Sequence, residues 1–172
     1  LIGWYMVQSG LIDIPEVSHY RLALHFLFAL IIVNYTLWII LDLLFPNKVV
    51  IKNQKYFKSI LVLTAILILQ ILYGTFVAGL NAGYFWNTFP LMNKQLIPIE
   101  LFSSSQNTLI HITNDLMTVQ FIHRMLAIIL LAYTLFLLLN KSKYQLSLSQ
   151  NSGLNIFAYV LSIQFIVGIT TL

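Results

Sequence analysis

The sequence predicts an all-α, polytopic membrane protein. Of its 172 residues, 59% are apolar and only 8% are charged, whereas a soluble domain carries about 25% charged residues. The nine basic and five acidic residues are too few to coat a soluble globule, and most lie between long apolar runs. The composition therefore argues against a soluble enzyme and a disordered chain. The basic residues sit in short loops and do not indicate nucleic-acid binding.

Four apolar runs are long enough to cross a membrane as helices, which takes about 20 residues each. They cover residues 22–41, 59–80, 116–139 and 154–172. The third run is interrupted by Gln120, His123 and Arg124. Residues 1–10 are expected to be the end of a further span that Gly10 closes. Because both ends of the chain lie in apolar runs, we expect a fragment of a longer membrane protein.

The lysines predict which loops face inward. The loop at residues 44–58 holds Lys48, Lys52, Lys55 and Lys58, and the loop before the last span holds Lys141 and Lys143. Acidic residues instead mark the segment before the first full span (Asp13, Glu16) and the long loop at residues 81–115 (Glu100, Asp115). Cytoplasmic loops are enriched in Lys and Arg. We therefore expect both lysine loops inside and the loop at 81–115 outside.

Aromatic residues gather where the outside loop begins. They are Tyr84, Phe85, Trp86 and Phe89. Such residues are common at membrane–water interfaces, so an interfacial belt explains them. A lid over a site on the outer side explains them equally well, and the sequence leaves both interpretations open. The polar stretch at residues 103–107 is expected to be a solvated turn.

Ionisable residues inside membrane spans are costly and are functional candidates by default. His25 and His123 lie near the outer ends of two spans that run in the same direction. Arg21 precedes His25 by one helical turn, and Arg124 follows His123 directly. Neutral imidazole ligates heme iron, and guanidinium suits carboxylates such as heme propionates. The alternative is that each histidine only forms a hydrogen bond between helices.

The two remaining histidines are expected to be solvated. His19 and His111 fall in segments outside the apolar runs.

Small residues and a short repeat mark further candidate contacts. Gly74, Ala78 and Ala82 form one stripe along a helix, and Gly79 and Gly83 form a second, as in tightly packed membrane helices. A flat ligand lying close to the helix is the alternative. The pattern Gln-x-x-x-Gly occurs at residues 70–74 and again at 164–168, and Gly3 opens a similar run. If Gly168 matches Gly3, another span with a histidine should follow roughly 20–25 residues later.

Several other chemistries lack their residues in this chain. It contains no cysteine, which excludes disulfides, thiolate metal sites and cysteine nucleophiles within it. It has no phosphate-binding glycine loop, no His-Glu-x-x-His motif and no serine elbow. No pair of acidic residues falls in one span, so the spans offer few residues that could form a proton relay.

Three sequence blocks resemble the heme A synthase family. They are GWYMVQSGL at residues 3–11 with YRLALH at 20–25, GTFVAGLNAG at 74–83 with NTFPLM at 87–92, and VQFIHRMLA at 119–127. The blocks occur in the family's order and reach across most of the chain. The absence of cysteine resembles the alphaproteobacterial and mitochondrial branch, whose outer loops lack a cysteine pair.

The resemblance implies eight helices in two pseudo-symmetric four-helix halves, each binding one heme on the outer side. Residues 1–43 would end the N-terminal half, which holds the substrate heme O. Residues 59–172 would belong to the C-terminal half, which holds a heme B cofactor. His25 with Arg21 would then serve the substrate heme, and His123 with Arg124 the cofactor heme, with each histidine an axial iron ligand.

The implied reaction oxidises a methyl group of heme O to a formyl group, giving heme A for cytochrome c oxidase. The partner histidines and a proposed catalytic glutamate would lie outside this fragment, which alone should be inactive. Heme O synthase and oxidase assembly factors are possible partners, and the electron donor is not assigned. The resemblance places the protein in a bacterial plasma membrane or the mitochondrial inner membrane.

Two other functions stay open at this point. A membrane b-type cytochrome would use the same histidines but only transfer electrons. A transporter or structural membrane protein would tolerate replacement of His25 and His123 without loss of heme.

Overall fold

The computed structural model describes residues 2–8, 17–46, 53–92, 94–102 and 108–171. Within these ranges the chain is helical, apart from turns, connecting segments and one isolated β-bridge between Met92 and Gln95. The long helices are α2 (His19–Leu44), α3 (Gln54–Gly79), α5 (Leu116–Leu139) and α6 (Leu148–Thr170). The short ones are α1 (Ile2–Val7), α4 (Thr108–Asn114) and the 3₁₀ helices η1 (Ala82–Tyr84), η2 (Ile99–Phe102) and η3 (Lys141–Tyr144).

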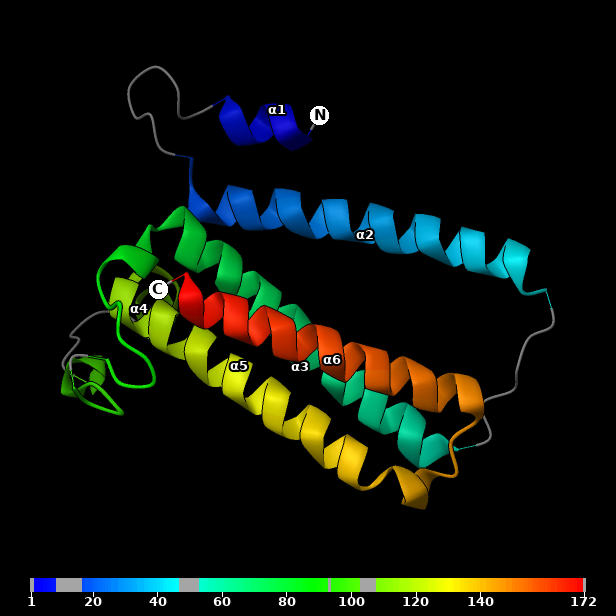
Figure 1. Cartoon of the computed structure of the whole chain (residues 1–172). Coiled ribbons are helices and arrows are strands. Elements are labelled where there is room, and N and C mark those ends of the chain that lie inside the picture. Colours follow the sequence, from blue (N-terminus) through cyan, green and yellow to red (C-terminus); the bar gives the residue numbers. More distant parts are fainter. Residues whose placement is uncertain (1, 9–16, 47–52, 93, 103–107, 172) are drawn as a thin grey trace.

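All four long helices are long and apolar enough to span a membrane, with mean hydropathies of 1.7 to 2.4. This confirms the predicted all-α membrane bundle. Consecutive long helices run antiparallel, so α2 and α5 begin at the end of the molecule where α3 and α6 finish (Figure 1). We call this the outer end, following the lysine distribution, and the opposite end the inner end.

Helices α3 and α5 form the centre of the bundle, with α2 packed on α3 and α6 packed on α5 (Figure 1). Two apolar clusters hold them together. The inner cluster consists of Leu63, Leu130, Leu137 and Leu154, and the outer cluster of Ala23, Phe76 and Val119. Outside these clusters most large apolar side chains are exposed, especially along α2. In a bilayer such surfaces face lipid or other helices rather than water.

Helices α3 and α6 begin several residues before their apolar runs, and polar residues cap both starts. The Asn53 side chain accepts hydrogen bonds from the backbone N–H groups of Lys55 and Tyr56, at 3.0 and 3.1 Å. Helix α6 begins with a capping box in which Ser147 and Gln150 each bond the other's backbone. The prediction of an inner loop ending at residue 58 was therefore wrong, since Lys55 and Lys58 lie on the first turns of α3. Long lysine side chains near a helix end can reach the membrane surface.

Some expectations concern residues outside the described ranges. They are those for Gly10, Asp13, Glu16, Lys48, Lys52 and residues 103–107.

The orientation of the bundle gives a direct labelling prediction. Leu96 lies in the outer loop and is 68% exposed, and Ser142 lies exposed between α5 and α6 at the inner end. We expect a cysteine at Leu96 to react with a membrane-impermeant maleimide added to intact cells or mitoplasts. A cysteine at Ser142 should react only after the membrane is permeabilised. The reverse pattern would invert the bundle and contradict the lysine argument.

Glycine 79 permits a close crossing between the end of α3 and the start of α2. A Cβ atom built at this position would lie 2.7 Å from Cβ and 2.9 Å from Cα of His19. Neither atom can move without moving α2, so only glycine fits. This confirms the tight-packing interpretation for Gly79, while the same test at Gly83 finds no atom within 4 Å.

We expect Gly79→Ala to push α2 and α3 apart and to destabilise the protein by about 1–3 kcal/mol, as overpacked cores do. The thermal unfolding midpoint of the detergent-purified protein would measure this. Gly83→Ala is the matched control and should leave the midpoint nearly unchanged. Equal midpoints for the two variants would show that the crossing can widen without cost.

Candidate functional site

The His123 side chain lies between α5 and α3, about two turns from the outer start of α5. Its Nε2 atom is 3.3 Å from Nε2 of Gln70 on α3. Its Nδ1 atom is buried, and among the described residues it has no hydrogen-bond partner. A buried imidazole nitrogen without a partner is costly unless another group binds the ring. The structure thus contains the interhelical contact expected from the alternative, and it leaves the second ring nitrogen without a partner in the described residues.

Glycine 74 gives this imidazole its place against α3. A Cβ atom at Gly74 would lie 3.2 Å from Cε1 and 3.7 Å from Nδ1 of His123. The first distance is tighter than ordinary van der Waals contact. Gly74 therefore leaves room for the His123 side chain, whereas Gly79 on the same helix leaves room for the backbone of α2 at His19.

His25 repeats this arrangement on α2. It lies at about the second turn from the outer start of its helix, and its side chain is half-buried. A Cβ atom at Gly3 of α1 would lie 3.4 Å from Cε1 and 3.9 Å from Nδ1 of His25. The two predicted histidines thus lie at similar depths. Each presents the Cε1–Nδ1 edge of its ring to a glycine on a neighbouring helix.

The two predicted arginines have different surroundings. Arg124 is 6% exposed and donates hydrogen bonds to the carbonyl of Thr88 at 2.6 Å and to the carbonyl of Trp86. Gln120, one turn earlier on α5, donates to the same Trp86 carbonyl at 3.3 Å. The Nε atom of Arg124 is buried and has no partner among the described residues. Arg124 thus holds the start of the outer loop against α5, a role that its position in the sequence did not indicate.

Arg21 instead packs on α1. Its guanidinium lies 4.7 Å from the ring centre of Tyr5, a cation–π geometry, and NH1 lies 3.5 Å from the Tyr5 carbonyl oxygen. The contact ties the outer ends of α1 and α2 together, close to the Gly3–His25 contact. Arg21 and Arg124 thus contact other parts of the chain, and their pairing with the two histidines at a site stays a prediction.

The prediction that His19 is solvated was wrong. Its ring is 7% exposed and meets Phe76 of α3 edge-on, with ring centres 5.4 Å apart. Its neighbour Tyr20 forms a 2.7 Å hydrogen bond with Thr113 of α4. The sequence signal that could have revealed this burial is Gly79, the small residue that lets α2 approach.

His111 is half-buried rather than freely solvated. Its Nε2 atom lies 3.1 Å from Oγ1 of Thr118 and 3.2 Å from the carbonyl oxygen of Leu101. These contacts connect α4 with the start of α5 and with η2. Its ring therefore serves the outer loop, and we assign it no ligand.

The aromatic residues at the start of the outer loop lie in two different environments, and the lid over an outer site stays a prediction. Tyr84 and Phe85 are 80% and 62% exposed, as expected of an interfacial belt. Phe89 instead packs edge-on against Phe165 of α6, with ring centres 5.9 Å apart. Together with the Arg124 contacts, this holds the loop across the outer ends of α5 and α6.

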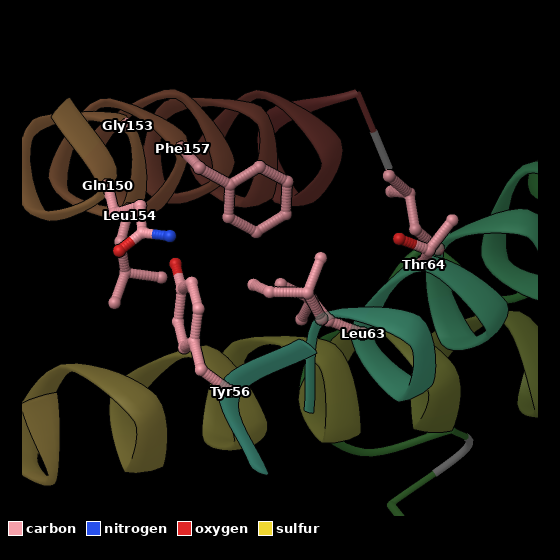
Figure 2. Close-up of a pocket in the computed structure, with 9 residues that line it drawn as sticks. Tyr56, Leu63, Thr64, Gln150, Gly153, Leu154 and Phe157 are labelled. Carbon is pink, nitrogen blue, oxygen red and sulfur yellow. The ribbon is translucent and has the colours of Figure 1, made fainter. Parts of the chain in front are cut away.

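The described residues offer no site for a bare metal ion, because no three His, Asp or Glu side chains gather in them. A cavity of about 350 Å³ lies between the inner halves of α3 and α6, and neither histidine lines it (Figure 2). Its walls are mainly apolar, with Tyr56, Thr64 and Gln150 as the polar residues. It has no ionisable group suited to acid–base chemistry, so we place the functional site at the outer end.

Fold and site together define a polytopic helical membrane protein with a glycine-backed histidine near the outer end of two of its helices. The chain belongs to the COX15-CtaA family, described as cytochrome oxidase assembly protein, which it matches over residues 1–172. It is a multi-pass membrane protein.

The curated relatives that it resembles carry one name. It is 43% identical to a heme A synthase of Flavobacterium psychrophilum, 41% identical to one of Flavobacterium johnsoniae and 41% identical to one of a Wolbachia pipientis strain. Each comparison covers 99% of this chain but only 49–50% of the relative. The chain thus spans about half the length of these proteins. No solved structure matches it.

Proposed function

We propose that this chain is part of a heme A synthase, which oxidises a methyl group of heme O to a formyl group and so provides heme A for cytochrome c oxidase. The observation that carries the proposal is its identity of 41–43% to heme A synthases across 99% of its length. The paired histidines at the outer end support it independently, because they are the residue type that such chemistry needs at matched depth. Heme O synthase and oxidase assembly factors are the partners we propose.

Histidine ligation of heme fits the residues that are present. Nε2 of His123 meets the Gln70 amide at 3.3 Å, Nε of Arg124 is a buried polar atom without a partner in the described chain, and Gly74 leaves the imidazole room that a Cβ would fill. When bound, the heme would supply the oxidation chemistry, and the protein would supply ligation, orientation and sidedness.

We assign the two histidines to two hemes. His123 would ligate a heme B cofactor, with Arg124 available to its propionates. His25 would ligate the substrate heme O, with Arg21 in the corresponding role. This division follows from placing residues 1–43 in an N-terminal half of the bundle and residues 59–172 in a C-terminal half.

The protein's own residues also keep the site at the outer membrane surface. Arg124 and Gln120 hold the loop that begins after α3, and Phe89 packs this loop against α6. A loop fixed in this way would restrict water around a heme bound beside His123. The oxidation would then occur on the side of the membrane that the lysine loops avoid.

The product identifies the function. The intact protein, expressed with heme O synthase in a host that lacks heme A, should yield heme A on chromatography of the extracted hemes. Bound heme without heme A, from correctly folded protein, would favour a b-type cytochrome that only transfers electrons. Absence of any bound heme would favour a transporter or structural role.

A further inference from the structure

The two candidate histidines rest on glycines in the same way. At Gly74 and at Gly3, the atom nearest to a built Cβ is Cε1 of the facing histidine, followed by Nδ1. The Nε2 atom is farther than 4 Å in both contacts. In each case the glycine lies on an earlier helix that packs against the helix of the histidine. Gly74 lies on α3, which packs against α5, and Gly3 lies on α1, which packs against α2. Such agreement between two separate helix pairs indicates a common role for the glycines.

The contact limits how each ring can turn. An imidazole has two soft torsions, and a backbone surface under one edge removes part of that freedom. With Nδ1 and Cε1 against the glycine, Nε2 is the nitrogen left to face another group. For His123 that group is the Gln70 amide, 3.3 Å away, on the same helix and one turn before Gly74.

The Gln70 contact is compatible with a heme-free protein. One imidazole nitrogen cannot accept a hydrogen bond and bind iron with the same lone pair. Gln70 therefore satisfies Nε2 only until a ligand takes its place, while the packing of the neighbouring Nδ1–Cε1 edge beside the glycine can stay. The lasting constraint on the ring is the glycine.

We propose that Gly74 and Gly3 are positioning residues that set the imidazole orientation of His123 and His25, so that Nε2 of each ring is presented to its heme iron. The inference rests on the proposed function, because it requires that these histidines ligate heme. It adds that the orientation of each histidine ring is set by a glycine on the neighbouring helix, α3 for His123 and α1 for His25. A Cβ at Gly74 would lie 3.2 Å from the His123 ring and should shift it, whereas a Cβ at Gly3 would lie 3.4 Å from the His25 ring, close to ordinary contact, and should shift it little.

Alanine substitutions in the intact protein test this ranking. Gly74→Ala should retain heme B on the order of tenfold more weakly, within the range seen when residues supporting a metal ligand are replaced. The heme that remains should show a larger high-spin fraction by electron paramagnetic resonance. Gly3→Ala should leave the heme B spectrum unchanged and weaken heme O retention by a smaller factor.

Gly153→Ala is the matched control, because Gly153 is also helical and has no atom within 4 Å of a built Cβ. It should keep the wild-type heme content and spectrum. All spectra are taken on the monodisperse fraction, so that misfolded protein does not contribute. Wild-type heme retention and spin state in Gly74→Ala would overturn the inference, as would equal effects of Gly74→Ala and Gly153→Ala.

A parallel His123→Ala preparation separates the two proposals. If it loses heme B while Gly74→Ala behaves as wild type, the positioning role fails and the proposed ligation stands. If His123→Ala keeps heme B with an unchanged spectrum, the ligation itself fails, and the positioning role fails with it.

Discussion

Replacing His123 by alanine is expected to remove most of the bound heme B, whereas replacing His25 should leave it in place. The His123 ring lies between α5 and α3, with Nε2 at the Gln70 amide and Nδ1 buried without a partner in the described residues. If His123 ligates the heme iron, as we propose, its loss should weaken heme retention by more than about tenfold, since even supporting residues contribute that much. The pyridine hemochrome spectrum of purified protein measures the retained heme.

The reciprocal variant makes this prediction specific. The His25 ring on α2 lies beside Gly3 of α1, whereas the His123 ring lies between α5 and α3. His25→Ala should therefore impair the binding and turnover of heme O with little change in heme B. His111→Ala serves as a control, because His111 bonds Thr118 and Leu101 within the outer loop. Equal loss of heme B from the His25 and His123 variants, at equal protein levels, would contradict the assignment of two separate sites.

The sequence was sufficient for the spans because hydropathy and charge act over whole segments. Each of the four predicted runs lies mostly within a long helix, and the two candidate histidines fall at similar depths. The helix starts were less predictable. Asn53 and Ser147 cap helices before the apolar residues begin, and lysines on the first turns of α3 can reach the membrane surface. Apolar content alone predicts neither the capping residues nor the helical lysines before the apolar run.

The roles of the small residues required the three-dimensional structure. Gly74 and Gly79 lie close together on one helix, yet one faces the His123 ring and the other the backbone at His19. No local pattern distinguishes these roles, because the partners are distant in sequence. The Gln-x-x-x-Gly repeat was the available signal for Gln70 and Gly74. Its second copy ends at Gly168, where a built Cβ meets no atom within 4 Å, and the histidine expected beyond it stays a prediction.

The sequence also could not predict which groups the arginine side chains contact. Arg124 follows His123 directly, and in a helix adjacent residues point about 100° apart. That spacing cannot say whether the guanidinium meets a ligand or a loop. The structure directs two of its nitrogens to the carbonyls of Trp86 and Thr88 and leaves Nε buried without a partner in the described chain. A role in holding the loop and a role toward heme propionates are therefore compatible.

Replacing Arg124 by methionine is expected to release the start of the outer loop. The Thr88 carbonyl would lose its donor, while the Trp86 carbonyl would keep only the longer bond from Gln120. A buried carbonyl without a donor costs about 1–3 kcal/mol. Because Thr88 is itself exposed, water should replace part of that bond, and we expect the lower half of this range. Local opening should rise about tenfold, since 1.4 kcal/mol is a factor of ten.

Limited chymotrypsin digestion of the detergent-purified protein can measure this opening, because Tyr84 and Phe85 lie in the affected segment and cleavage follows the open population. Arg21→Met is the matched control: it removes an arginine of the same outer surface whose contacts are with Tyr5, and it should not change loop cleavage. Arg124→Lys should fall between, since one ammonium cannot reproduce a two-pronged contact. Unchanged cleavage in Arg124→Met would show that the carbonyl bonds do not hold the loop. Heme B loss without faster cleavage would then assign the guanidinium to the propionates alone, whereas both effects together would make Arg124 the residue that couples loop closure to the cofactor.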